Sequence, residues 1–526
     1  MNDYNVTGTT LGDAFAKLPP NWGQLTGALL FLAACTWIYL PAFDGVPAPF
    51  AGYRSPLEPA IVAKTRYAFA ASDIISEGYA KWKSSMYKIS RHGGDVVVLS
   101  RKYIDELQNA PHERLSSIKG LIKNFGGQYS GIDLLDESDI GTRALQTKIT
   151  PNLTKFSDDM RDELEYALGR DMPDCEDWTL VPLQPILLKL LGRITSRVLI
   201  GLPICRDEKW LDAASQHAHN VTITQIVMKA VHPIFRPFLN LVLPTVWRYK
   251  SAVRRGKAIL APEVQRRRNL EDNDPDYVKP NDLLQAMMDL STPGGKDSQP
   301  EDLAHRHLLI TLVAGHSTAA AGSHALMDLV SRPQLLEELR DEVLQVLQEN
   351  GGNWGKQSLS KLWKMDSFFR ESQRQNPPSL LGFHRIVQDP AGITLHDGVH
   401  VPYGTHLCIA PHSVSSDPAV IPNPDVFDGL RYYEQRRQKP DESMKHQHAT
   451  ADKNHLHFGY GTWSCPGRFL ASDELKMTLS ALLLRYDFKY PDGSSRPTNK
   501  HIDEFPYVDP ETPLLMRRRH QGGTGV

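Results

Sequence analysis

The chain has 526 residues and a nearly balanced charge, with a formal net charge of −2 from 59 basic and 61 acidic side chains. Nothing in this balance indicates a nucleic-acid partner. The five cysteines are odd in number and widely scattered, which argues against a disulfide framework and is typical of a reducing compartment. Because no long linker and no internal repeat divides the sequence, we expect one large domain.

The N-terminal region predicts a membrane anchor. Residues 25–43 are apolar apart from Thr26 and Thr36, and at about 1.5 Å per residue they nearly cross a hydrocarbon core of about 30 Å. Basic residues follow this stretch instead of preceding it, which disfavours a cleaved signal peptide and predicts that the rest of the chain is cytosolic. We therefore expect residues 1–24 in the lumen, with Asn5 in a glycosylation sequon, and a stiff proline-rich tether over residues 44–60.

Residues 61–526 carry mainly helical patterns, so a mainly α fold with small β-sheets is expected. Prolines and glycines interrupt the patterns and set their ends. The apolar stretch 226–247 also contains prolines, and buried core is its simplest explanation. We expect one early strand, 95–100, and long helices over 61–82, 158–168, 185–200, 209–229, 246–268, 303–329 and 471–484.

Small residues occupy the centre of the apolar helix 303–329, in the run Val313-Ala314-Gly315-His316-Ser317-Thr318. Gly315 weakens the helix, and the Ser317 hydroxyl can bond back to a carbonyl or hold a water, so a local widening of the helix is expected. A helix crossing built from small residues has the same pattern. The run by itself leaves a packing role and a functional role open.

An acidic and a basic residue, Glu371 and Arg374, lie one turn apart near the end of another predicted helix. An exposed pair of this kind contributes about 0 to 1 kcal/mol to stability. When such a pair is buried, removal of one member strands the other charge and costs about 3 to 5 kcal/mol. The importance of the pair therefore depends on its burial.

A single cysteine, Cys465, lies in the glycine-rich loop 458–467, directly before the predicted helix 471–484. Gly461 and Gly467 permit backbone conformations and close approaches that a side chain would obstruct. Backbone N–H groups near a helix N-terminus favour a thiolate, which is the form of cysteine that ligates metals. An isolated cysteine is more often a small buried hydrophobe, but the surrounding glycines favour a metal ligand.

A second metal interpretation uses the histidines that precede this cysteine. Imidazole and thiolate are the ligand types of zinc sites, but the spacing is not distinctive, and charged neighbours favour a solvated loop. The candidate zinc ligands are His446, His448, His455, His457 and Cys465.

The loop resembles the haem-binding loop of the cytochrome P450 family, the haem-thiolate monooxygenases, in its Phe458, its glycines and its cysteine followed by Pro-Gly. The run 313–318, the pair at 371 and 374, and the segment 424–431 resemble further motifs of the family in the same order. The resemblance implies a single mainly helical haem-thiolate monooxygenase domain behind the transmembrane helix. It also implies that Cys465 is the axial ligand of haem b iron and that Gly461 and Gly467 shape the loop around it.

Within helix 303–329 the resemblance implies a role in oxygen chemistry. Ser317 takes the place of the family's principal alcohol, His316 takes the place of its acid, and Thr318 follows. Cleavage of O2 needs two protons, which must reach an otherwise apolar pocket through a hydroxyl or an ordered water. The family has a carboxylate at the position of His316, whereas the imidazole of histidine has a pKa of about 6.5. The identity of the group that relays the protons therefore stays open.

The resemblance also assigns residues around the haem. It implies that Glu371 and Arg374 are buried and are joined by Arg431, and that Arg385 binds a haem propionate. Trp463 departs from the family, which usually has a cation at that position. An indole N–H can donate a hydrogen bond, but it supplies no charge.

The function implied by the resemblance is insertion of one oxygen atom from O2 into a lipophilic small molecule, with electrons from a membrane-bound NADPH-dependent reductase. Similarity to fungal members suggests a secondary-metabolite intermediate, a terpenoid, polyketide or alkaloid, and a single-pass protein of the endoplasmic reticulum membrane. In such an enzyme the stretch 226–247 would form a substrate-entry lid that dips into the bilayer. Desaturation, ring formation or isomerisation on the same haem-thiolate scaffold stays an alternative, as does a membrane-tethered zinc-binding scaffold.

Overall fold

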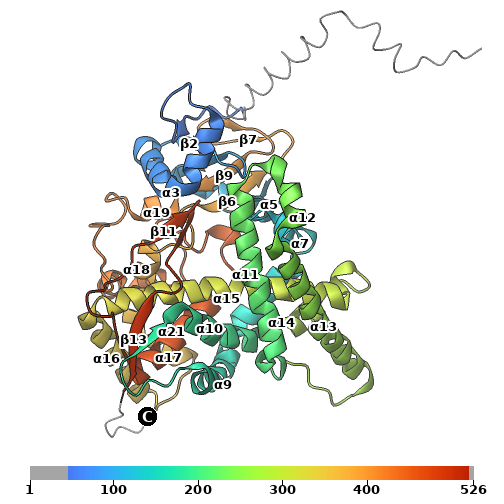
Figure 1. Cartoon of the computed structure of the whole chain (residues 1–526), viewed down its shortest axis with the longest axis vertical. Helices are drawn as coiled ribbons and strands as arrows, with labels where there is room; N and C mark the ends of the chain where they lie inside the picture. Colours follow the sequence, from blue (N-terminus) through green and yellow to red (C-terminus); the bar gives the residue numbers. More distant parts are fainter. Residues whose placement is uncertain (1–44, 520–526) are drawn as a thin grey trace, which may run out of the picture.

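The computed structural model describes residues 45–519 (Figure 1). Over these residues the fold is mainly helical with four small sheets, as the sequence predicts. The long helices are α3 (Ala60–Trp82), α9 (Leu153–Asp171), α10 (Leu183–Ile200), α11 (Glu208–Ala230), α13 (Pro244–Asn273), α15 (Pro300–Val330), α16 (Pro333–Glu349), α18 (Trp363–Gln375) and α21 (Arg468–Arg485). The shorter helices are α4 (Ile104–Leu107), α5 (Ser117–Asn124), α6 (Gly127–Ser130), α7 (Leu134–Glu137), α8 (Ile140–Ala144), α12 (Arg236–Val242), α14 (Leu283–Leu290), α17 (Lys356–Lys361), α19 (Pro411–Ser415) and α20 (Arg431–Gln438).

The largest sheet has six strands in the order β1-β2-β3-β9-β6-β4, and its neighbours are antiparallel except for the parallel pairs β1 with β2 and β3 with β9. A three-stranded sheet has the order β10-β13-β5, and two hairpins pair β7 with β8 and β11 with β12. The strands are β1 (Phe50–Ala51), β2 (Met86–Ile89), β3 (Val96–Leu99), β4 (Leu115–Ser116), β5 (Thr179–Pro182), β6 (Gly382–Val387), β7 (Ile393–Thr394), β8 (His400–Val401), β9 (His406–Ile409), β10 (Tyr486–Lys489), β11 (Lys500–Ile502), β12 (Phe505–Tyr507) and β13 (Pro513–Arg518). β1 lies in the stretch 44–60, where the prolines predict a tether, so this stretch contributes an edge strand to the folded domain.

The helix α15 crosses the middle of the molecule and organises the main hydrophobic core (Figure 1). Its first residue, Pro300, needs no hydrogen-bond partner for its nitrogen, and Glu301 and Asp302 in the first turn complement the helix dipole. At the crossing with α21 a Cβ on Gly322 would lie 3.1 Å from the Leu475 side chain. This close crossing places the helix that carries the run 313–318 beside the helix that follows the cysteine loop.

The long helices are found close to their predicted bounds, because the apolar periodicity of each is strong. The predicted helix 61–82 is α3, and the predicted helix 471–484 lies inside α21. One detail is wrong: α15 is a continuous α-helix from Pro300 to Val330, without the widening expected at Gly315. The hydroxyls beside this glycine are satisfied by carbonyls within the regular helix, so nothing forces the helix to open.

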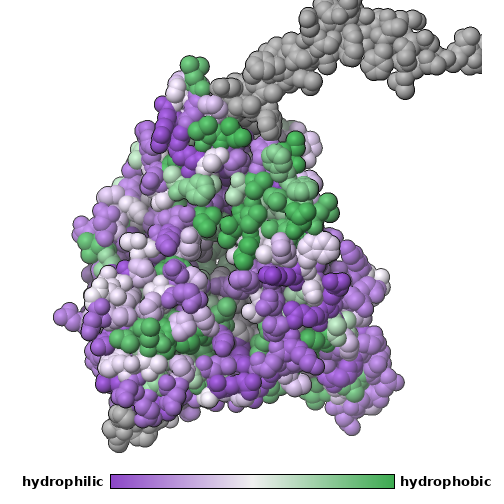
Figure 2. Space-filling view, in the orientation of Figure 1, coloured by the Kyte–Doolittle hydropathy of each residue, from purple (hydrophilic) through white to green (hydrophobic). Residues whose placement is uncertain are grey.

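The stretch 226–247 is not buried core, contrary to the simplest prediction from its sequence. Prolines divide it into the end of α11, a short turn, α12 and the start of α13. Met228 and Val246 at the two ends join the core, but most apolar side chains between them are uncovered. Phe238 is 64% exposed and Leu241 is 65% exposed. Figure 2 shows the resulting green surface around α12. We call this surface the α12 patch; it consists of Ile234, Phe235, Phe238, Leu241, Val242 and Trp247.

None of the helices within residues 45–519 is both long and apolar enough to cross a membrane. The anchor expected at 25–43 and the sequon at Asn5 lie outside the described residues. Both therefore stay predictions from the sequence.

Candidate active site

The loop that holds Cys465 is built by backbone conformations that only glycine adopts easily. Gly459 and Gly461 have φ values of +73° and +71°, in the left-handed region. A Cβ on Gly461 would lie 2.5 Å from the carbonyl oxygen of Gln108, so the loop packs directly on that backbone. The Cys465 N–H donates to the Phe458 carbonyl at 2.7 Å and closes the loop. The chain then enters α21 at Arg468.

The Cys465 side chain is exposed, although the thiol lies among many protein atoms. Burial raises the pKa of this thiol, and the backbone N–H groups of Gly467 and Arg468 oppose the rise because they stabilise the thiolate. A Cβ on Gly467 would meet no atom within 4 Å. The sulfur therefore combines access to an open space with donors that favour its charged form.

One face of α15 is also left uncovered. Val313 is 54% exposed and Ser317 is exposed, whereas most residues of this helix are buried. Residues four apart lie on the same helical face, so the two side chains belong to one stripe. An exposed valine on the central helix of a core indicates a face shaped for an apolar group.

Arg385 is a buried cation without an anion. Its side chain is 4% exposed, and neither Nε nor one of the two Nη atoms has a hydrogen-bond partner. The other Nη donates to the His384 carbonyl at 2.9 Å, and the guanidinium stacks over the Phe383 ring. Burial lowers the pKa of Arg385 to about 10. Such a group requires a carboxylate or phosphate, and a haem propionate meets this requirement.

Trp463 also has an unpaired donor. Its indole Nε1 is buried without a hydrogen-bond partner, and its ring lies 5.8 Å from that of His112. Next to it, the Thr462 hydroxyl donates to the Asn109 side chain at 3.0 Å. The indole can thus donate to a second propionate while the loop is held against residues 108–112. An accessible thiol, an uncovered face of α15 with Val313 on it, and two side chains with unpaired buried donors together fit a haem.

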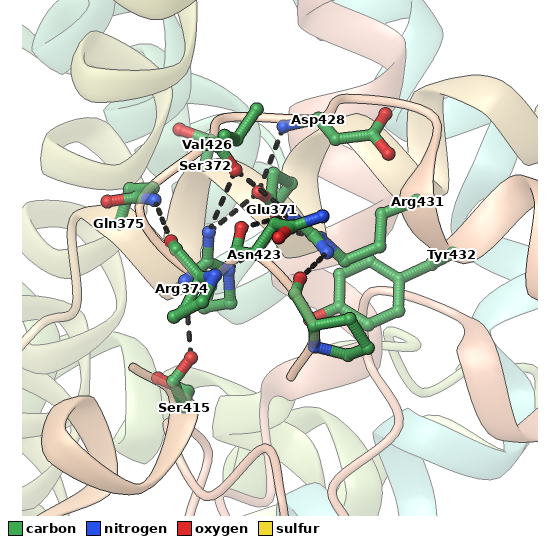
Figure 3. Close-up of polar contacts among 12 residues, drawn as sticks. Glu371, Ser372, Arg374, Gln375, Ser415, Asn423, Val426, Asp428, Arg431 and Tyr432 are labelled. Carbon is green, nitrogen blue, oxygen red and sulfur yellow. Dashed lines mark hydrogen bonds and ion pairs between the residues drawn. The ribbon is translucent and has the colours of Figure 1, made fainter. Parts of the chain in front are cut away.

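The buried pair expected from the sequence is present on α18 (Figure 3). Glu371 and Arg374 are both fully buried, and their side chains form two hydrogen bonds of 2.8 Å. Arg431 joins them, with Nε 3.3 Å from the carboxylate, and the Asp428 N–H donates to the same carboxylate at 3.0 Å. Arg374 also donates to the Ser415 carbonyl. The structure thus brings together all three residues that the sequence predicts as a structural lock.

The residues of the run 313–318 do not all face the same way. The Ser317 hydroxyl donates to the Val313 carbonyl at 2.7 Å on the uncovered face of α15. The Thr318 hydroxyl donates to the Ala314 carbonyl at 2.8 Å, and its side chain is only 5% exposed. Ser317 is therefore available to an occupant of the open space, while Thr318 packs into the core.

His316 lies on another face of α15 and lines a cavity below α11. Its Nε2 is buried and has no hydrogen-bond partner. Burial lowers the pKa of His316, and the charge of His219 on α11 lowers it further. The imidazole is therefore neutral near pH 7 and can both donate and accept a hydrogen bond.

The cavity that His316 lines has a volume of about 1020 Å³. Its walls come from α10, α11, α15 and the β11–β12 hairpin, and they include Phe125, Ile223, Ile226, Gly315 and Phe505. A cavity of this size lies at the upper end of the usual range for small-molecule pockets, about 300 to 1,000 Å³, so it can enclose a drug-sized molecule. The sequence did not reveal this cavity, because its walls come from segments hundreds of residues apart that share no motif.

The zinc interpretation of the histidine-rich segment is not supported. Within residues 45–519 no group of three or more His, Cys, Asp or Glu side chains is placed to hold a metal ion. His448 packs on the Phe369 and Phe458 rings, and His455 contacts the Gln373 side chain at 2.9 Å. These imidazoles belong to the packing beneath the cysteine loop.

A buried carboxyl on α21 makes the stability of the fold depend on pH. Glu474 is 1% exposed, and burial raises its pKa to about 8 even with the Thr195 hydroxyl beside it. Between about pH 4.5 and pH 8 the unfolded chain ionises this group and the folded chain does not, so the unfolded state binds fewer protons and stability falls as pH rises. At pH 7 the cost is on the order of 3 kcal/mol.

Glu474→Gln is therefore expected to raise the thermal midpoint at pH 7.5 and to change it little at pH 5. Thermal unfolding followed across this pH range measures the effect. Glu165→Gln is the control, because Glu165 forms an exposed ion pair with Arg485. Equal pH profiles for Glu474→Gln and the unmutated protein would contradict the prediction.

The comparisons with known proteins agree with this geometry. The family model described as Cytochrome P450 matches residues 179–512. Cytochrome P450 monooxygenase ltmK of Epichloe festucae (strain Fl1) is 54% identical over 501 residues, 95% of this chain and 94% of the relative. Cytochrome P450 monooxygenase AN1598 of Emericella nidulans is 44% identical over 90% of this chain and 88% of its own length. Ent-kaurene oxidase of Fusarium fujikuroi is 34% identical over 93% of each.

A solved structure shows the same fold. The heme domain of cytochrome P450DA superposes with a TM-score of 0.64 and covers 92% of this chain and 99% of that domain, at 15% sequence identity. At this identity the likeness concerns the fold alone. From the family match and the curated relatives, the chain belongs to the cytochrome P450 family and is a haem-dependent monooxygenase.

Proposed function

We propose that the protein inserts one oxygen atom of O2 into a terpenoid of fungal secondary metabolism, with electrons from a membrane-bound NADPH-dependent reductase. The observation that carries the substrate class is the cavity of about 1020 Å³ beside α15, whose wall surface is mostly apolar although charged side chains such as Arg193 and Asp212 also line it. The relative named ent-kaurene oxidase supports a terpenoid over a polyketide or an alkaloid.

The residues of the site have distinct parts in this proposal. Cys465 holds the iron of haem b, which supplies the activation of O2 when bound. Arg385 and Trp463 bind the propionates through their unpaired N–H groups. Ser317 presents a hydroxyl on the uncovered face of α15, where it can hold a water and pass protons, and the neutral imidazole of His316 orients the substrate or a water from the cavity side.

Two measurements test the proposal. The reduced protein with carbon monoxide should give the Soret shift of a thiolate-bound haem, and its absence would overturn the assignment of Cys465. Turnover under ¹⁸O2 with reductase, NADPH and terpenoid hydrocarbons, ent-kaurene among them, should give a product with one labelled oxygen atom. A product without label would indicate desaturation, ring formation or isomerisation instead.

We also propose that the protein is held at the endoplasmic reticulum membrane by the predicted anchor and that the α12 patch enters the bilayer. The patch is a contiguous apolar surface whose members are between 51% and 66% exposed, and a surface of this kind marks a site of contact with a lipid or protein partner. In this arrangement the stretch 226–247 is the lid of the cavity, and a lipophilic substrate would pass from the bilayer into the cavity without crossing water.

A fluorophore attached at Phe238→Cys in the full chain should then be quenched by nitroxide-labelled lipids in phosphatidylcholine vesicles. The same fluorophore at Val278→Cys, a residue 85% exposed outside the patch, is the matched control and should not be quenched. The unmutated chain, labelled in parallel, gives the background from the natural cysteines. Equal quenching at the two positions would contradict entry of the patch into the membrane.

A further inference from the structure

The turn between β11 and β12 is fixed to the body of the protein by a buried carboxylate. Glu504 is fully buried and pairs with Arg91 at 2.8 Å. It also accepts a hydrogen bond of 2.6 Å from Asn124, and its backbone carbonyl accepts one of 2.8 Å from Leu380 N–H. Partners on three separate segments hold this turn rigidly, since loss of any one would strand a buried charge or polar group.

The neighbouring residue, Asp503, directs its carboxylate to a lysine on α11. It has a φ of +56°, which aspartate tolerates better than most residues, and its backbone N–H donates to the Ala68 carbonyl at 2.9 Å. One carboxylate oxygen accepts from the Glu504 N–H at 2.9 Å. The other oxygen lies 2.8 Å from Nζ of Lys229. Asp503 is thus oriented by its own turn toward α11.

Lys229 lies in the last turn of α11, directly before the chain turns toward the α12 patch. Its side chain and that of Asp503 are each only 10% exposed. The ammonium also lies over the Phe505 ring, 4.6 Å from its centre, and this ring packs against Phe125 at 5.5 Å. The ion pair therefore joins a rigid hairpin to the helix end from which the lid begins, two segments that are far apart in the sequence (Figure 1).

The ion pair and the aromatic rings beside it line the cavity of about 1020 Å³. Lys229, Asp503, Phe505 and Phe125 belong to its wall, with Ile226 one turn before Lys229 on α11. When the pair is formed, α11 and the hairpin are held together at this wall. When it is broken, Lys229 loses its closest anion and this contact no longer ties the end of α11 to the hairpin.

We propose that the Lys229–Asp503 pair is a latch that determines specificity by limiting the size of the molecules that enter the cavity. The inference rests on the proposed function only in that a bound haem reports ligand entry. Lys229 and Asp503 act through the position of α11 and are positioning residues, not catalytic ones. If the pair is such a latch, small ligands enter the cavity while the pair is formed, and bulky ligands enter only after the pair has broken.

The test compares a small and a bulky haem ligand in the full-length holoprotein. Imidazole and clotrimazole both shift the Soret band, so stopped-flow absorbance gives the association rate of each. In Lys229→Met, which keeps most of the side-chain length without the charge, the clotrimazole rate should rise about tenfold or more while the imidazole rate stays unchanged. Lys229→Arg restores the charge and should return the ratio of the two rates toward that of the unmutated protein.

Lys279→Met is the matched control, because Lys279 bridges the exposed Glu271 and Asp289 and does not line the cavity. Asp503→Asn breaks the same pair from the other side with a residue that also tolerates positive φ. If Lys229→Met does not fold, the ratio of the two association rates is measured in Asp503→Asn instead. A normal carbon monoxide spectrum with an unchanged ratio of rates in the Lys229→Met or Asp503→Asn variant would overturn the latch. Loss of the thiolate-haem band in the unmutated protein would overturn the proposed function instead.

Discussion

Glu371→Ala is expected to leave little haem-loaded protein. The carboxylate of Glu371 is fully buried, and it balances Arg374, also fully buried, and Arg431, 9% exposed. Removing it strands two guanidinium groups in the core beneath the cysteine loop. The cost of a broken buried pair is about 3 to 5 kcal/mol, which is a large part of a typical stability of about 5 to 15 kcal/mol.

The matched control is Glu434→Ala. Glu434 and Arg437 on α20 have the same spacing as Glu371 and Arg374 and are separated by 3.4 Å, but their side chains are 48% and 59% exposed. This pair contributes little, so its removal should leave yield and haem content near those of the unmutated protein. Haem per polypeptide and the thermal midpoint measure both variants. Normal haem content in Glu371→Ala would show that the three residues do not form a lock.

The sequence predicts those parts of the site that depend on residues close together in the chain. Apolar periodicity located α15 and α21, and the spacing of Glu371 and Arg374 indicated a pair on one helical face. The glycines around Cys465 indicated a tight loop, because no other residue adopts its φ values easily. Each of these signals involves residues within a few turns of one another.

The remaining features depend on tertiary packing. The sequence does not say that His316 faces α11 while Ser317 faces the open space, since this follows from how α15 is rotated against its neighbours. The apolar residues of 226–247 predict burial, but prolines divide the stretch and leave most of these residues between Met228 and Val246 without a covering element. The network around Glu504 joins partners from residue 91 to residue 504 and has no motif.

Gly461→Ala and Gly467→Ala are expected to act in different ways, although both lie in the cysteine loop. At Gly461 a side chain meets two obstacles: the left-handed φ of +71° and the Gln108 carbonyl oxygen 2.5 Å from the new Cβ. The conformation alone costs about 1 to 2 kcal/mol. The contact is with backbone, which no rotamer change relieves, so the loop must move away from residues 108–112. We expect low yield and a several-fold loss of haem content.

At Gly467 the φ is −90°, and a new Cβ would meet no protein atom within 4 Å. The polypeptide itself therefore tolerates Gly467→Ala, and the far-ultraviolet circular dichroism of the variant should match that of the unmutated protein. The added methyl group enters the space next to Cys465, so a haem bound there would be pushed from the sulfur. The expected result is a folded protein with reduced haem retention and a weakened thiolate band with carbon monoxide. Full retention of haem in Gly467→Ala would show that the haem does not approach this side of the loop. An unfolded variant would show that the polypeptide needs this glycine in order to fold, whether or not haem is bound.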